Sequence, residues 1–203
     1  MGHIYIMRHG ATDWNREGRL QGQRDKPLND LGRDQARQAG ERFRARGLQF
    51  DQVISSPLCR ARETAALCTG LGEDRLRLDP RLMEMDFGPY EGVRFREAGE
   101  ELRRFFRDPV GCPLPGMETA THLLDRTASF LEDLKQEAEK ERVLIVTHGV
   151  AIRALLCHLT GGGREVWSMP IDNCVLYETR LEQGVYGVAA LAERSQDETQ
   201  ETY

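Results

Sequence analysis

Two short apolar runs, residues 4–7 (IYIM) and 143–146 (VLIV), constrain the fold of this 203-residue chain most strongly. Neither run alternates with polar residues, which is the pattern of strands buried on both faces of a sheet. Residues 53–54, 175–179 and 185–191 predict further strands. Because helical patterns separate most of these strands, we expect an α/β fold, a three-layer sandwich with a largely parallel central sheet.

Several segments between the strands carry helix signals. Residues 29–46 begin at a capping asparagine and end before a glycine. Ser56 and Pro57 predict the start of a second helix, which ends near residue 70 and has Arg60 in its first turn. Further helices are expected at 97–107, 118–140 and from 149 to 159, with a short strand somewhere in residues 80–116.

The length of the chain suits one domain with a sizeable core. We expect residues 1–192 to form this single domain and residues 193–203 to be a loose polar tail. Residues 88–116 are rich in Gly, Pro and Arg and weakly periodic, as in insertions that cover an active site. This 88–116 segment is therefore expected to cap the site.

Composition excludes several classes of protein. The net charge of −5 provides no general attraction to nucleic acid, and no apolar run approaches the ~20 residues of a membrane span. The five cysteines are odd in number and include no C-x-x-C, so neither a disulfide framework nor a cysteine zinc site is indicated. A cytoplasmic protein is expected, with a homodimer left open.

Polar groups follow the strands at one edge of the predicted sheet, where open α/β sheets bind ligands. The segments are residues 8–10 (RHG), 55–57 (SSP) with Arg60, and 147–149 (THG). Two imidazoles, two guanidiniums and a helix N-terminus suit a doubly charged oxyanion, most commonly phosphate. Either histidine alone could be structural, but two that each follow a buried strand and precede a glycine favour a functional site.

A metal site is the rival interpretation of the two histidines with acids such as Glu84 or Asp86. The nearby arginines raise the positive potential where a cation would bind, and no third ligand lies at a familiar spacing. We therefore expect neither a metal nor a cofactor.

Four ordered blocks carry a resemblance to a known family. They are residues 8–15 (RHGATDWN), 55–65 (SSPLCRARETA), 82–92 (LMEMDFGPYEG) and 147–149 (THG). Together they resemble the histidine phosphatase superfamily, in the branch that includes cofactor-dependent phosphoglycerate mutases and small-molecule phosphatases. The resemblance implies a phosphoglycerate mutase-like fold and covers residues 3 to 190 approximately.

The resemblance also implies roles for particular residues. By similarity His9 is the nucleophile, which spacing alone could not distinguish from His148. Arg8, Arg60 and His148 would hold the phosphoryl oxygens, and Glu84 would protonate the leaving alcohol. Further phosphate or substrate contacts are implied at Asn15, Gln21 and Gly22, with Thr12 and Gly149 as additional candidates.

Departures from the mutase pattern favour a hydrolase. Val150 stands where mutases usually carry an asparagine, and Phe95 stands where a lysine is expected. Residues 113–119 (PLPGMET) resemble a block of α-ribazole phosphatase-like and broad-specificity members. We therefore expect a phosphomonoester hydrolase that acts through a phosphohistidine on a small metabolite, such as α-ribazole 5'-phosphate or a sugar or glycerate phosphate. A cofactor-dependent phosphoglycerate mutase is the alternative. A non-catalytic module that binds phosphorylated ligands is less favoured, because this chain has a suitable residue at every position that performs chemistry in the family.

Overall fold

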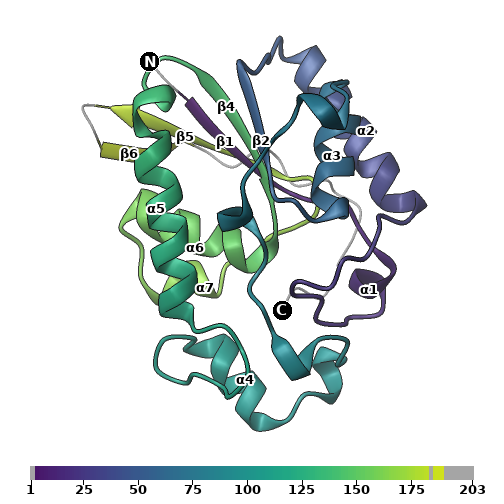
Figure 1. Ribbon diagram of the computed structural model, residues 1–203, viewed down its shortest axis with the longest axis vertical. Helices are drawn as coiled ribbons and strands as arrows, with labels where there is room; N and C mark the ends of the chain where they lie inside the picture. Colours follow the sequence, from purple (N-terminus) through teal and green to yellow (C-terminus); the bar gives the residue numbers. More distant parts are fainter. Residues whose placement is uncertain (1–2, 183–184, 190–203) are drawn as a thin grey trace.

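The strands form one mixed sheet in the computed structural model, which describes residues 3–182 and 185–189 (Figure 1). Within these residues the strand order is β3-β2-β4-β1-β5-β6. The strands are β1 (His3–Arg8), β2 (Gln52–Ser55), β3 (Arg77–Leu78), β4 (Arg142–Thr147), β5 (Leu176–Glu182) and β6 (Val185–Ala189). The first four are parallel, whereas β5 and β6 are antiparallel to their neighbours. The expected largely parallel sheet is confirmed.

The register of β1 and β4 determines where the polar loops emerge. Arg8, the last residue of β1, lies opposite Thr147, the last residue of β4. Ser55 at the end of β2 pairs with Val146. All three predicted loops therefore leave the sheet at the same edge, as the sequence predicts.

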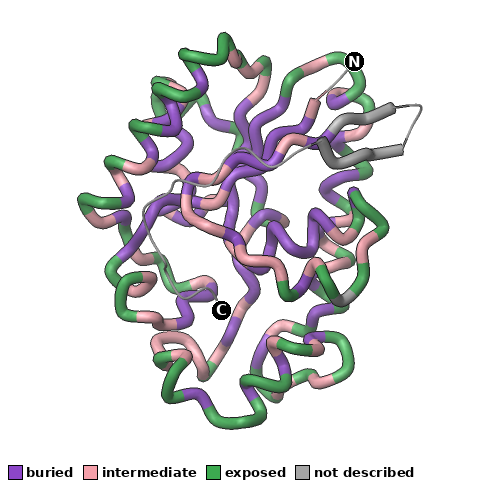
Figure 2. The backbone as a smooth tube through the Cα atoms, turned by 180° about the vertical axis from the view of Figure 1, so that it is seen from behind, coloured by how far each residue is buried: buried purple, intermediate pink, exposed green. Residues whose placement is uncertain are grey.

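Helices cover both faces of the sheet, which confirms the three-layer arrangement. These helices are α2 (Asp30–Ala45), α3 (Cys59–Thr69), α5 (Ala120–Ala138) and α6 (Gly149–Thr160). Buried side chains of β1 alternate between the layers: Ile4 packs with α5 and α6, whereas Tyr5 packs with α2 and α3. Figure 2 shows the buried strands inside and exposed residues mainly along the outer helices and loops.

The 88–116 segment forms the lower end of the molecule in Figure 1, around α4 (Glu100–Arg107). Leu102 and Phe105 of α4 belong to a buried cluster with Leu123 of α5 and Ala154 of α6. The predicted strand within residues 80–116 is wrong. Short 3-10 turns occupy this region instead, two of them with a proline in the first turn, where the missing N–H cannot pair with another strand.

The predicted start of α3 is also wrong, because a residue distant in sequence supplies the cap. The helix begins at Cys59, whose N–H donates to Asp25 Oδ1 at 2.8 Å. Ser56 instead accepts from the Leu58 N–H and lies 2.7 Å from a ring nitrogen of His148. Arg60 remains in the first turn, as predicted.

The other helix predictions are close to the observed bounds. Asn29 caps α2 and Gly70, at φ 77°, ends α3. The predicted 97–107 and 118–140 helices begin later, after Gly99 and Thr119. Short helical segments that the sequence did not predict are α1 (Asp13–Arg16), α7 (Arg164–Trp167) and the 3-10 turns Glu73–Arg75, Pro80–Leu82, Gly88–Tyr90 and Phe95–Glu97.

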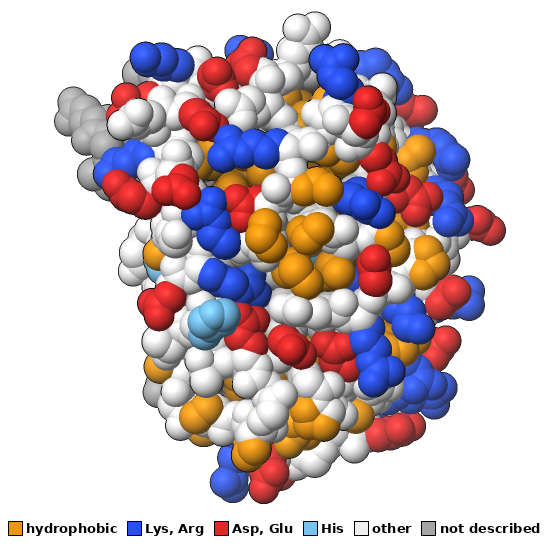
Figure 3. All heavy atoms as spheres, in the orientation of Figure 1, with side chains coloured by type: hydrophobic (Ala, Val, Ile, Leu, Met, Phe, Trp, Pro, Cys, Tyr) orange, Lys and Arg blue, Asp and Glu red, His pale blue; other side chains and the backbone are white. Residues whose placement is uncertain are grey.

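Two further features concern the surface and the end of the chain. Basic and acidic side chains are interspersed on the face shown in Figure 3. None of the described helices is long and apolar enough to cross a membrane. The predicted polar tail, residues 193–203, lies outside the described residues, as do residues 190–192.

Candidate active site

His9 directly follows β1 and is held as a neutral imidazole. Its Nδ1 lies 2.7 Å from the carbonyl oxygen of Gly10, which can only accept, so Nδ1 carries the proton and Nε2 keeps its lone pair. Burial of the ring, followed by the charges of Arg60 and Arg8, holds the pKa of His9 well below its usual range. The main chain is also fixed, because Asn173 Nδ2 donates to the carbonyl oxygen of His9 at 2.6 Å. The ring is therefore held as a single neutral tautomer with an unprotonated Nε2.

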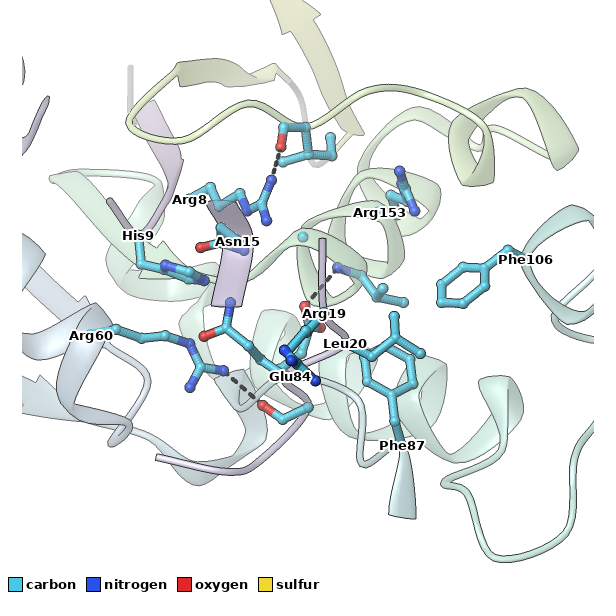
Figure 4. A pocket seen from close by; sticks show the side chains of 15 residues that line it. Arg8, His9, Asn15, Arg19, Leu20, Arg60, Glu84, Phe87, Phe106 and Arg153 are labelled. Carbon is cyan, nitrogen blue, oxygen red and sulfur yellow. Dashed lines mark hydrogen bonds between the residues drawn. The ribbon is translucent and has the colours of Figure 1, made fainter. Parts of the chain in front are cut away.

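Two guanidinium groups lie beside this ring (Figure 4). Arg60 is completely buried and donates to the carbonyl oxygens of Arg24 at 2.9 Å and Gly22 at 2.7 Å. Burial lowers the pKa of Arg60 to about 10, so the group remains a cation at neutral pH. Arg8 donates to the carbonyl oxygen of Ile171 at 2.5 Å. Both cations are anchored at the edge of the pocket nearest His9.

The loop that holds Arg60 is shaped by a carboxylate from the third sequence block. Glu91 accepts the N–H groups of Gln23 at 2.7 Å and Arg24 at 3.1 Å. Gly22 has a φ of +55°, and a Cβ atom there would collide with the Glu91 carboxylate. Glu91 and Gly22 thus fix the carbonyl groups that orient Arg60.

Glu84 presents its carboxylate to the pocket from a loop, against the N-terminus of α6. Its Oε1 accepts from Met85 and Ala151, both at 3.0 Å, and its Oε2 accepts from Val150 at 3.1 Å. The N–H groups of Val150 and Ala151 belong to the first turn of α6, where they have no partner within the helix. The carboxylate is therefore held in one orientation, next to Gly149.

His148 is the N-cap residue of α6, and its ring lies next to the ring of His9. The centroids of the two rings are 5.1 Å apart, and His148 is completely buried. Burial and the charge of Arg60 hold its pKa well below the usual range. Its Nε2 lies 2.7 Å from the Ser56 hydroxyl, while its Nδ1 is buried without a hydrogen-bond partner among the described residues. An unsatisfied buried polar atom of this kind is uncommon in folded proteins and distinguishes His148 from an ordinary core histidine.

The structure brings most of the predicted site residues to one pocket. Those that line it are Arg8, His9, Asn15, Gln21, Gly22, Arg60, Glu84 and Gly149. His148 and Thr12 do not. Thr12 is buried and forms a capping box with Asn15: its hydroxyl accepts from the Asn15 N–H, and the Asn15 side chain accepts from the Thr12 N–H. Thr12 thereby orients a residue that does line the pocket.

The remaining residues that line the pocket are ones that the sequence did not identify as site residues. They are Arg19, Leu20, Phe87, Phe106, Val150, Arg153 and Ile171. Leu20, Phe87, Phe106 and Arg153 among them form its far wall, away from His9. Arg153 is a nearly buried arginine in the otherwise apolar helix α6, which is a signal that could have identified it. Phe106 carries no such signal, because its position depends on how the 88–116 segment folds back. In the part of the chain that the structure describes, no three His, Cys, Asp or Glu residues are grouped to hold a metal.

A neutral histidine between arginines, at the carboxyl edge of a mostly parallel sheet, defines a phosphoryl-handling α/β protein. Residues 4–194 match the histidine phosphatase superfamily (branch 1), and the chain therefore belongs to this family. It is a histidine phosphatase that acts on small phosphorylated metabolites.

Known proteins similar to this chain include phosphatases and a mutase by name. "Putative phosphoserine phosphatase 2" of Hydrogenobacter thermophilus is 36% identical over 90% of this chain and 91% of its own length. "Probable phosphoglycerate mutase GpmB" of Salmonella choleraesuis is 36% identical over 79% of this chain and 76% of its own length. The structure of mycobacterial glucosyl-3-phosphoglycerate phosphatase with VO3 superposes with a TM-score of 0.80 at 28% identity, covering 93% of this chain and 98% of that one.

Proposed function

We propose that this chain hydrolyses a phosphomonoester in two phosphoryl transfers, with His9 as the nucleophile. The observation that carries the proposal is the neutral His9 ring, whose Nδ1–H is committed to Gly10 and whose Nε2 is available beside two arginines. In the first transfer Nε2 bonds to phosphorus while the ester oxygen leaves and takes a proton from Glu84. In the second, water attacks phospho-His9, Glu84 takes up the proton of the water, and inorganic phosphate is released.

The other site residues neutralise and orient the phosphoryl group in this proposal. Arg8 and Arg60 face its oxygens, and fixed donors of this kind typically contribute about 10²- to 10³-fold each to the rate. Asn15, Gln21, Gly22, Gly149 and the free Nδ1 of His148 complete the oxygen contacts, and Thr12 acts by orienting Asn15. Because the guanidiniums supply the positive charge, the reaction needs neither a metal nor a cofactor.

The far wall limits which phosphomonoesters fit. Leu20, Phe87 and Phe106 provide an apolar surface away from His9, and Arg153 adds a basic group to the lining. This mixture suits a small metabolite with an organic part of limited size, such as a sugar or glycerate phosphate or α-ribazole 5'-phosphate. A panel of phosphomonoesters, assayed for phosphate release, identifies the preferred member.

Hydrolysis is favoured over the alternative, a cofactor-dependent phosphoglycerate mutase. Val150 lines the pocket where mutases usually place an asparagine, and Phe95 packs in the apolar cluster around α4 rather than supplying a lysine. A mutase must also exclude water from its phosphohistidine. We expect 3-phosphoglycerate with 2,3-bisphosphoglycerate to give little 2-phosphoglycerate in a coupled enolase assay. Interconversion faster than phosphate release from every ester tested would reverse this ranking.

The phosphohistidine is tested directly by rapid quench with a ³²P-labelled ester. The wild-type protein should give a labelled phosphoenzyme that is labile in acid and stable in base. His9→Ala should give none and should lose hydrolysis, whereas His158→Ala, on the same chain but outside the pocket, should label normally. Undiminished labelling of His9→Ala would assign the nucleophile elsewhere.

A further inference from the structure

The loop that carries Glu84 has no regular structure of its own. It lies between the 3-10 turns Pro80–Leu82 and Gly88–Tyr90, so no helix or strand hydrogen bonds fix its main chain. The contacts to α6 orient the carboxylate of Glu84 but not the chain on either side of it. Proton transfer needs the acid within hydrogen-bond reach of the leaving oxygen, so the loop itself requires support.

An arginine from α5, Arg126, provides this support. Its Nη1 donates to the carbonyl oxygen of Arg81 at 2.6 Å, and its Nη2 donates to the carbonyl oxygen of Glu84 at 3.2 Å. The same guanidinium binds both oxygens of Glu118, with Nε at 2.7 Å and Nη2 at 3.0 Å. Its side chain is only 12% exposed. One planar group thus connects the 3-10 turn before the loop, and the loop itself at Glu84, to a carboxylate near the start of α5.

Glu118 completes the connection on the other side of Glu84. Its carboxylate Oε2 accepts the N–H of Asp86 at 3.1 Å, while its own N–H donates to the carbonyl oxygen of Asp86 at 2.8 Å. Its side chain is 6% exposed. Burial acts to raise the pKa of Glu118, but the hydrogen bonds and charge of Arg126 hold it below the usual value, so the pair remains ionised at neutral pH. The loop is consequently held at residues 84 and 86, and the turn that precedes it is held at residue 81.

We propose that Arg126 and Glu118 are positioning residues that hold the Glu84 loop so that Glu84 can protonate the leaving group. The inference rests on the proposed acid role of Glu84. Arg126 does not line the pocket and touches neither substrate nor His9, so it acts through the loop. A lysine cannot replace it, because one ammonium nitrogen cannot reach two carbonyl oxygens and both oxygens of a carboxylate in this geometry.

The test compares two substrates that differ in their need for an acid. An alkyl phosphate requires protonation of its leaving oxygen, whereas p-nitrophenyl phosphate hardly does. Arg126→Lys, Arg126→Met and Glu118→Gln should each lower kcat/KM, which reports phosphoenzyme formation and not the later attack of water, by about 10- to 100-fold for the alkyl phosphate and by less than about 3-fold for p-nitrophenyl phosphate. The matched control is Asp133→Asn, which removes an exposed pair between α5 and Arg81 but leaves the main chain of the loop untouched. It should behave as wild type on both substrates.

Glu84→Gln and the double variant Glu84→Gln/Arg126→Met separate this inference from the proposed function. If Arg126 acts through Glu84, Arg126→Met should lower kcat/KM for the alkyl phosphate by less than about 3-fold in the Glu84→Gln background. Equal losses on both substrates in folded Arg126→Lys, checked by thermal melting, would overturn the positioning role. Equal losses in Glu84→Gln itself would remove the acid role from Glu84 and the inference with it. Loss of phosphoenzyme labelling from ³²P-labelled p-nitrophenyl phosphate in Arg126→Lys would likewise count against it, since that ester needs no acid and His9 is not the target of Arg126.

Discussion

The two ends of the pocket are built differently. At the end proposed to bind phosphate, Arg8, His9 and Arg60 lie at the ends of a central strand and a packed helix; His9 and Arg60 are buried and Arg8 is half-buried. At the far end, Phe87 and Phe106 come from a loop and from α4, beside the 3-10 turns of the 88–116 segment. The group common to all phosphomonoesters thus meets the rigid framework. The part that differs between substrates meets the irregular segment, which can change without disturbing the sheet.

The largest expected effect comes from removing a charge at the phosphate end. Arg60→Met should lower kcat/KM by about 10²- to 10³-fold, because a fixed donor to the phosphoryl oxygens is lost. If the two ends are separable, the loss should be similar for every ester, as measured by phosphate release across a panel. Arg62→Met, which alters a partly exposed arginine on the same helix, is the control and should change little. A loss confined to one substrate would contradict the division between the ends.

A smaller and selective effect is expected at the far end. Phe106→Ala should lower kcat/KM by about 10-fold for esters with a bulky apolar group, since one apolar contact is worth roughly 1–3 kcal/mol. The smallest esters should be little affected, and phosphoenzyme formation from them should persist. Val110→Ala tests the same segment at an exposed apolar position and should leave selectivity unchanged. Uniform losses for all substrates would show that Phe106 supports the phosphate end instead.

The buried neutral histidine predicts a pH dependence of stability. The pKa of His9 is lowered in the folded protein, so below pH 6.5 the unfolded chain binds a proton that the folded chain does not. The free energy of unfolding should therefore fall with decreasing pH, by up to about 1.4 kcal/mol per pH unit for this group. Urea unfolding between pH 7.5 and 5.5 measures the slope, which His9→Asn should reduce. An unchanged slope would mean that His9 titrates normally.

The smallest expected effect is that of chelation. EDTA should leave hydrolysis unchanged, because Arg8 and Arg60 supply the positive charge in the proposed mechanism. The assay is phosphate release before and after dialysis against EDTA. Activity that is lost and then restored by a divalent ion would replace the arginine-based account of the phosphate end with a metal-based one.

This difference between the ends also explains what the sequence could predict. His9 and Arg60 could be predicted as site residues because each follows a clear sequence signal. His9 follows a buried apolar run, and Arg60 follows the start of a predicted helix. Phe106 was not, because its place depends on tertiary packing of a weakly periodic segment. The start of α3 was mispredicted for a similar reason, since Asp25 rather than Ser56 meets the first helical N–H. Local patterns do not contain such long-range hydrogen bonds.

The position of β1 has a consequence for folding. The first strand of the chain lies between β4 and β5, so it pairs only with segments that begin about 140 and 170 residues later. Contacts of such high sequence separation form slowly, because the entropy of closing a long loop is lost before the contacts stabilise it. A growing chain therefore exposes the apolar residues of β1 until β4 leaves the ribosome. His9, which follows β1, gains its surroundings only when synthesis is nearly complete.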